Sequence, residues 1–400
     1  MGLTKIQQEN KYHSIIMFVY ICGLPHFWYK DVDWSPRKKN LLKFASKFIN
    51  HIGNLFFITE LLAYFTQKEL DEQQFSFWFG CAFTHTMCIS AIFSLVYHKK
   101  NIESLITRMI VTIPNIHHDE EVSEKMIKKC FLYVLTSIST LNLTVLFHGV
   151  KASKEYMNGG IFLPVITFWP KTSDLSTAAT IGRFVAYIMW WIWVARVSGI
   201  LTTAIILTIC SSHLFNHLQT YFKKMSTIFE ENLTIDQKQQ KYEASMKVAF
   251  KMHHDILNHI EVLIDVCNVT YGGQILMNVS ILTIMMFQLA SLEHFSIVEI
   301  LPHIMIMITV LTVTACYMWS LGDVTIESAE LSNAIYMSGW ENCQNDYSIK
   351  MRRLVMIAMT QTQKPLETKT LGLIPVSHES YVSIVKASYS IFSLIFYNNT

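Results

Sequence analysis

The sequence predicts an all-α membrane protein with seven transmembrane helices. Of its 400 residues, 51% are hydrophobic and only 16% are charged, which is too apolar for an ordinary soluble protein of this length. Long apolar runs recur along the whole chain, and a helix that spans a bilayer needs about 20 such residues. A transmembrane β-barrel would instead show short segments of alternating hydrophobicity, which this sequence lacks.

The first apolar stretch lies close to the N-terminus. Lys5 and Lys11 precede the segment SIIMFVYICGL, a pattern that is similar to the hydrophobic region of a signal peptide. No small-residue cleavage site follows, because the chain continues with Pro25, His26 and two aromatic residues. We therefore predict a retained interfacial or re-entrant helix in preference to a cleaved signal.

Seven further apolar runs are each long enough to cross a bilayer as a helix. Most of the eight cysteines lie inside apolar runs and none forms a CxxC pair, so we expect buried free thiols rather than a disulfide framework. The predicted spans are 41–65, 74–97, 130–150, 181–210, 262–290, 300–322 and 376–397.

The positions of the basic residues predict the orientation of these spans. On one side of the membrane, the N-terminal segment and the later connections carry 25 Lys and Arg residues, whereas the other side carries four. Cytosolic segments carry the excess of Lys and Arg, so the N-terminus is predicted to be cytosolic and the C-terminus extracellular. A conventional G-protein-coupled receptor has the opposite orientation, and its characteristic acidic-Arg-aromatic and Asn-Pro motifs are absent here.

Two of the cytosolic connections are predicted to be helical. The segment KYEASMKVAFKMHHDILNHIEVLIDV has helical periodicity and runs directly into the span at 262–290. The segment YSIKMRRLVMIAMTQTQKPL is a second candidate helix, which Pro365 ends. Helices that project below the membrane favour packing against one another or against partner subunits.

The last predicted span carries a polar stripe. On a helical wheel the polar residues fall within a single arc of about 80°. Hydrocarbon would penalise this stripe, and its lysine above all, so the stripe must face protein or water. Two interpretations stay open, a polar seam against a neighbouring helix or the wall of an aqueous pore, which the bulky Leu394 at the edge of the stripe could close by dewetting. The stripe consists of Ser383, Lys386, Ser390, Ser393 and Tyr397.

Four segments together resemble insect odorant receptors. The C-terminal KASYSIFSLI is similar to a signature of that family, and the upstream SLGDVTIESAELSNAIYMSGW and RRLVMIAMTQTQKPL resemble its cytosolic region. The segment FLPVITFWP resembles a loop before the fourth span, although the tyrosine that the family has between Trp169 and Pro170 is missing. The matching positions are Leu163, Pro164, Trp169, Pro170, Gly322, Glu327, Ser328, Leu331, Ala334, Tyr336, Trp340, Arg352, Arg353, Gln363, Lys364, Pro365 and Leu366.

The resemblance implies a tetrameric ligand-gated cation channel in which tuning subunits join a shared odorant co-receptor. It implies three regions: a ligand-binding transmembrane bundle at 1–322, cytosolic anchor helices at 323–375, and a pore-lining last helix with a short extracellular tail at 376–400. It favours the pore interpretation of the stripe and places Leu394 at the gate, near Ser390 and Tyr397. The compact connection between the fourth and fifth spans is unlike the co-receptor, so we expect a tuning subunit.

A volatile ligand implies an apolar, aromatic-rich cavity with few polar groups. The family places this cavity in the outer half of the second, third, fourth and sixth spans. For any single aromatic residue there, ordinary helix packing or an interfacial belt is the favoured interpretation, and the prediction rests on the set. The two histidines are the expected hydrogen-bond donors. The candidates are Phe75, Phe79, Phe83, Val145, His148, Phe184, Tyr187, Trp191, His303, Ile304 and Met307.

Other function classes have little support in the sequence. It contains no phosphate-binding loop, nucleophile elbow or paired-carboxylate site, so we expect no enzyme activity, no cofactor, no metal and no nucleic-acid partner. We expect a multi-pass protein of the plasma membrane, and the resemblance implies the dendrite of a sensory neuron. A gustatory-type receptor of the same fold is the main alternative, followed by a metabotropic seven-helix receptor and, more weakly, a transporter.

Overall fold

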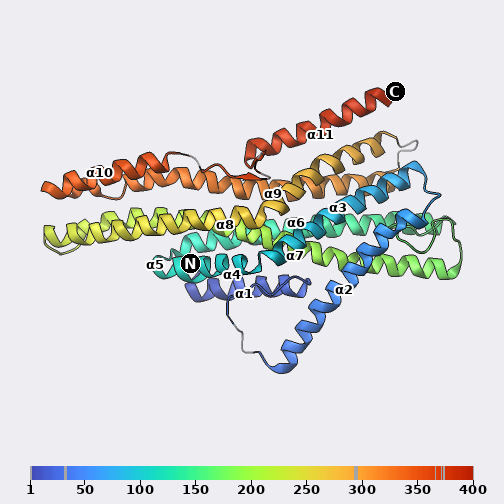
Figure 1. The fold of residues 1–400 in the computed structure, drawn as a ribbon, viewed down its shortest axis with the longest axis horizontal. Helices are drawn as coiled ribbons and strands as arrows, with labels where there is room; N and C mark the ends of the chain where they lie inside the picture. Colours follow the sequence, from blue (N-terminus) through green and yellow to red (C-terminus); the bar gives the residue numbers. More distant parts are fainter. Residues whose placement is uncertain are drawn as a thin grey trace.

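The computed structural model describes residues 2–30, 34–291, 296–364, 366–370, 372 and 374–399, and within them the chain is almost entirely helical (Figure 1). Turns and loops connect the long helices, among them a long loop between Met157 of α6 and Thr177 of α7, and one two-stranded antiparallel sheet precedes the last helix. The elements are α1 (Lys5–Ile21), α2 (Pro36–Thr66), α3 (Glu72–Tyr97), α4 (Lys99–Thr107), the π-helix η1 (Arg108–Thr112), α5 (Ile113–Ile116), α6 (Glu120–Met157), α7 (Thr177–Met225), the 3₁₀-helix η2 (Ser226–Glu230), α8 (Ile235–Ala290), α9 (Ile297–Tyr336), the 3₁₀-helix η3 (Trp340–Asn342), α10 (Asn345–Thr362), β1 (Lys369–Thr370), β2 (Ile374–Pro375) and α11 (His378–Asn399).

The seven predicted spans correspond to α2, α3, α6, α7, α8, α9 and α11, so the all-α membrane fold is confirmed. Among the described residues, six helices are long and apolar enough to cross a membrane. The seventh, α11, has 22 residues and is less apolar because its serines and Lys386 lie within it. The N-terminal segment forms α1, which packs against α2, α6 and α7 with Tyr12, Ile16 and Val19 buried.

Several helices extend well beyond the hydrophobic spans. The segment 216–261, predicted as a connection, is largely the end of α7 and the start of α8, joined only by η2 and a short turn. The start of α8 is capped by Thr234, whose hydroxyl accepts from the Gln237 amide while the Gln237 side chain accepts from the Thr234 amide. Hydropathy marks where a helix enters the membrane, whereas capping residues mark where it begins, so the predicted boundaries were too short.

The central helix of the bundle is α7. Its most apolar stretch is 83% buried, against 39% or less in the other five long spans. It packs against α1, α2, α6, α8 and α9, and small residues allow the close approach. At Gly199, for example, a Cβ atom would lie 2.8 Å from the Cβ of Cys22. Because α7 is surrounded by protein, the cavity-lining residues that it carries are held in fixed positions.

The predicted cytosolic anchor forms a helical layer at one end of the molecule, where α8, α9 and α10 project together (Figure 1). α9 ends at Tyr336, and a left-handed Gly339 with φ of 86° precedes η3 and α10. The Tyr242 and Ser338 hydroxyls are 2.6 Å apart, and the Gln344 amide donates to Gln239 Oε1 at 2.6 Å, so this layer is tied to α8. The predicted region boundary at 322/323 falls inside the continuous α9, and Pro365 lies outside the described residues.

Candidate functional site

An apolar cavity of about 120 Å³ lies between α3, α6, α7, α8 and α9; we name it the inner cavity. Aromatic rings from two helices dominate its wall, namely Phe77 of α3 and Trp190 and Trp193 of α7. A smaller cavity of about 80 Å³ continues it along the bundle and shares Thr84 and Leu141 with it. Such a concave, aromatic, mostly apolar space suits a small apolar ligand.

A second, more polar cavity of about 230 Å³ lies beside the inner cavity and shares the wall residue Phe77; we name it the outer cavity. His148 and His303 line it, together with Lys151 and Glu155 at the end of α6. The His148 ring stacks on Phe77 with centroids 5.1 Å apart, and its Nδ1 lies 2.9 Å from the Thr144 carbonyl oxygen. Phe77 therefore separates a charged outer compartment from the apolar inner one.

The structure brings only part of the predicted ligand set to these cavities. Val145 lines the inner cavity, and His148 and His303 line the outer cavity. Tyr187 lies behind the wall, where its hydroxyl donates to the Val145 carbonyl at 3.1 Å, and the Trp191 ring packs on Tyr187 at 6.2 Å.

The remaining predicted residues lie elsewhere. Four of them are exposed on the outside of the bundle, and two are partly buried but line neither cavity. Their contact with a ligand stays a prediction. The exposed residues are Phe75, Phe79, Phe184 and Ile304, and the partly buried residues are Phe83 and Met307.

The sequence reading missed one ionisable pair at the inner cavity. Glu60 of α2 is completely buried, and its Oε2 lies 2.7 Å from Nδ1 of His85 of α3, which lines the inner cavity. The Trp78 indole donates to the Glu60 carbonyl at 2.9 Å and fixes α3 against α2 at this level. A glutamate and a histidine inside two predicted spans were a usable signal, because buried ionisable groups within a membrane pair with one another and mark functional sites.

The last helix is attached to the bundle along one face only. Ile384 and Ser388 of α11 are buried, and the Thr283 hydroxyl of α8 donates to the Ser388 carbonyl at 3.3 Å. The opposite face carries the predicted stripe, of which Ser393 is half-buried. Figure 1 shows α11 at the edge of the molecule, with its C-terminal end diverging from α9. The exposed residues of this face are Ser383, Lys386, Ser390, Leu394 and Tyr397.

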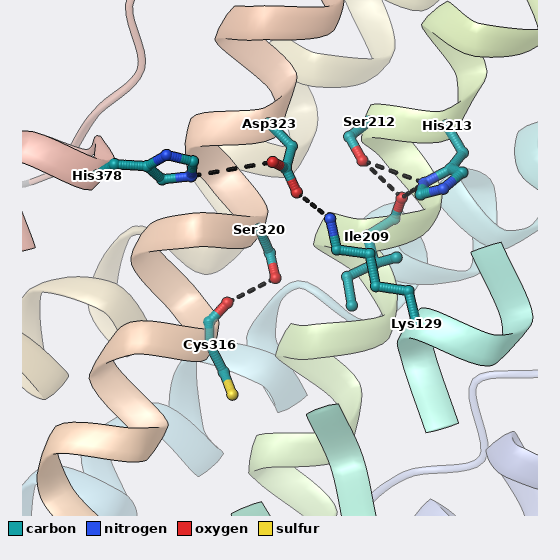
Figure 2. Close-up of polar contacts among 8 residues, drawn as sticks. All are labelled: Lys129, Ile209, Ser212, His213, Cys316, Ser320, Asp323 and His378. Carbon is teal, nitrogen blue, oxygen red and sulfur yellow. Dashed lines mark hydrogen bonds and ion pairs between the residues drawn. The ribbon is translucent and has the colours of Figure 1, made fainter. Parts of the chain in front are cut away.

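A charged cluster joins three helices near the base of α11 (Figure 2). Asp323 of α9 forms an ion pair with Lys129 of α6, and its other oxygen lies 3.9 Å from Nε2 of His378. His378 is the first residue of α11. In the described part of the chain, no group of three His, Cys, Asp or Glu side chains is arranged to hold a metal ion.

The helical bundle, its interior apolar cavity and its peripheral last helix define a multi-pass membrane receptor. Residues 73–389 match the family model described as 7tm Odorant receptor, which is most of the chain. The chain therefore belongs to the odorant receptor family, as its motifs predicted, and this is a family of receptors and not of enzymes.

Individual proteins agree with this assignment. A stretch of 145 residues is 26% identical to Odorant receptor 33b of Drosophila melanogaster, and it covers 36% of this chain and 36% of that relative. Over 98% of both chains, the fold is similar to that of the insect olfactory receptor OR5 from Machilis hrabei, with a TM-score of 0.76 and 11% identity. The structure of OR5 in complex with eugenol gives a TM-score of 0.70 at the same identity, over 98% of this chain and 99% of that one.

Proposed function

We propose that this chain is a tuning subunit of an odorant-gated, non-selective cation channel. A small volatile organic ligand binds in the cavities of the bundle, and the last helix of each subunit lines a central pore. The channel is a heterotetramer with an insect odorant co-receptor, in the plasma membrane of a sensory neuron dendrite. OR5, which has a similar fold, has been solved in complex with eugenol, and this supports a small volatile as the ligand here.

The exposed polar face of α11 carries this proposal. Lys386 makes no ion pair with the described residues, and it lies on the face that points away from α8. A lysine facing hydrocarbon within a membrane costs several kcal/mol, about 2.5–3.5 on insertion scales. Around a shared axis with other subunits, the same face borders water, and this removes the cost.

The cytosolic layer supports assembly with other subunits. α10 buries Met351 and Val355 against its own chain but leaves three large apolar residues exposed, which are Ile349, Met356 and Ile357. Exposed apolar residues gathered on one helix favour a protein contact. The likeness in fold alone fits a gustatory-type receptor channel as well, and the ligand response distinguishes the two.

Whole-cell recording tests the proposal. The chain is expressed with and without an insect odorant co-receptor, and a broad panel of volatiles is applied while G-protein signalling is blocked. A rapid cation current that requires both chains and a volatile supports the tuning subunit. A slow, G-protein-dependent response contradicts it in favour of a metabotropic receptor, and a response to non-volatile tastants alone favours the gustatory-type alternative.

A further inference from the structure

The wall of the inner cavity contains a histidine, His85, and Glu60, which does not line the cavity, fixes the orientation of its ring. His85 lines the cavity, is more than nine-tenths buried and lies with Nδ1 2.7 Å from the fully buried carboxylate of Glu60. This contact occupies Nδ1 and leaves the second ring nitrogen, Nε2, available to a ligand. We propose that the inner cavity recognises volatile ligands that carry a hydrogen-bond acceptor, such as the carbonyl of a ketone, aldehyde or ester, and that His85 Nε2 is the donor.

Proton counting shows why Nε2 acts as a donor. A buried pair in a low-dielectric interior avoids a net charge. The Glu60–His85 pair is neutral overall in two arrangements, an ionised carboxylate with an imidazolium or a protonated carboxyl with a neutral imidazole. In the first, both ring nitrogens carry protons; in the second, the carboxyl donates to Nδ1 and the ring proton lies on Nε2. Both neutral arrangements therefore leave an N–H group at Nε2.

Arg196 is a further charged group in this part of the bundle. Its guanidinium donates to Asn54 Oδ1 at 2.5 Å and to the Asn50 carbonyl at 3.4 Å. Asn54 lies six residues before Glu60 on α2, which corresponds to about 9 Å along the helix axis. Among the described residues, His85 is the hydrogen-bond partner of the Glu60 carboxylate through Oε2, Oε1 has no partner, and Arg196 forms no ion pair with it.

The threonine hydroxyls of the wall already have partners and do not compete for an acceptor. The Thr84 hydroxyl donates to the Gly80 carbonyl at 2.8 Å, and the Thr144 and Thr309 hydroxyls lie 2.8 Å from each other. The Trp193 indole N–H has no hydrogen-bond partner among the described residues, and its ring lies 5.1 Å from that of His85. An indole nitrogen can only donate. A ligand oxygen between these two rings would meet donors from both.

Matched ligands give the first test of this inference, which rests on the odorant-gated function proposed above. For each ketone or ester that evokes current, the isostere with C=CH₂ in place of C=O and the corresponding secondary alcohol are applied to the chain with its co-receptor. We expect the carbonyl compound to be about tenfold more potent than its C=CH₂ isostere, the effect of one hydrogen bond made in a buried site. Equal potency of the two, or an alcohol far more potent than the ketone, would overturn the inference.

Substitutions give the second test. His85→Phe keeps a ring but removes the donor, so the preference for the carbonyl compound should disappear, whereas His85→Gln supplies an amide N–H and should retain part of it. His51→Phe makes the same change at an exposed position of α2 and should leave the potency ratio unchanged. If His85→Phe does not reach the cell surface, His85→Met against His85→Gln makes the same comparison. If the preference for the carbonyl compound survives removal of the donor, the inference is overturned. If the wild-type chain reaches the cell surface with its co-receptor but gives no current with any volatile, the proposed function is overturned as well.

Discussion

Lys129 of α6 and His378 of α11 share the carboxylate of one aspartate. Asp323 forms an ion pair with Lys129 through Oδ2, and its Oδ1 lies 3.9 Å from His378 Nε2 (Figure 2). α6 also carries Thr144 and Val145 of the inner cavity wall. The same helix thus borders the cavity at one level and is tied to the base of the last helix at another.

We predict that Asp323→Asn weakens the coupling between ligand and current. The substitution leaves Lys129 without its counter-ion and removes the charge that faces His378, so α6 and α11 lose a common partner. Odorant concentration–response curves should shift by about three- to tenfold toward higher concentration at normal surface expression. Glu124→Gln, which removes the Lys128–Glu124 pair on the surface of α6, is the control and should have no effect. An unchanged curve for Asp323→Asn would show that this cluster does not transmit the signal.

We predict that Leu394→Ala opens the proposed gate. Leu394 is 64% exposed on the outward face of α11, and a smaller side chain there would allow water to enter an apolar constriction. A standing current without odorant, several times that of the wild type, is the expected result in whole-cell recordings. Ile395→Ala alters an exposed aliphatic residue on the side of the same helix away from the polar stripe and should produce no standing current. If the Leu394→Ala channel shows no standing current but still responds to odorant, the gate lies elsewhere.

Lys386→Gln should change the selectivity of the proposed pore. The lysine is exposed on the same face as Ser383 and Ser390, and a cation there repels divalent ions more than monovalent ions. Removing one charge at about 10 Å in water changes the local energy of a monovalent ion by about 0.4 kcal/mol. The calcium-to-sodium permeability ratio, measured from reversal potentials, should therefore rise about twofold. Lys171→Gln, at an exposed lysine in the loop before α7, is the control, and identical ratios in all three channels would argue against a pore-lining Lys386.

Gly53→Ala should destabilise the bundle. A Cβ atom at Gly53 would lie 2.5 Å from Cδ of Arg196, a fully buried side chain that is held by Asn54. Displacing this arginine strains the α2–α7 contact, and overpacking of this kind costs about 1–3 kcal/mol. Thermal unfolding of the purified protein should show the loss. Gly273→Ala, whose Cβ would lie 3.8 Å from Met87, is a matched interior control with an ordinary contact. Equal melting temperatures for the two variants would mean that Arg196 moves aside without cost.

Acid should release the contact between α1 and the segment that follows it. The hydrogen bond from Lys30, at 2.5 Å, holds the pKa of Glu9 below its ordinary value of 4.5, although burial acts in the opposite direction. A carboxyl group whose pKa is lowered by folding stabilises the folded state at pH values above its ordinary pKa. This stabilisation is lost as the pH falls through the folded-state pKa. Because both side chains are partly exposed, the contribution is only about 0.5 kcal/mol. Glu9→Gln should therefore melt slightly below the wild type at pH 7 and equally at about pH 3; a constant difference would contradict the pairing.

The helices could be predicted from the sequence because hydropathy and periodicity are local properties. Each of the seven predicted spans lies within a helix, apart from the two residues just before His378, and the cytosolic helix predicted to run into the fifth span is the first part of α8. The lengths were less predictable. α7 and α8 continue far beyond the apolar stretch, because helix ends depend on capping and on packing with neighbouring helices.

The face that each helix turns inward was harder to predict. On α3 the predicted aromatic residues Phe75 and Phe79 point outward, whereas Phe77 between them lines both cavities. Apolar residues cover α3 on all sides, so its sequence shows no preferred inner face. On α11, by contrast, the polar residues mark one side of the helix, and the predicted stripe does form one exposed face.

The sequence by itself determined the class of membrane protein, its spans and its family, because composition, periodicity and short motifs are readable along the chain. The orientation across the membrane stays a prediction from the basic residues. Only the tertiary structure decided which groups meet. It placed Arg183 on the carbonyls of Lys171 and Asp174, Arg196 on Asn54, and Glu60 on His85. These partners lie on different helices or loops, and their pairing follows from how the helices pack, which no local pattern encodes.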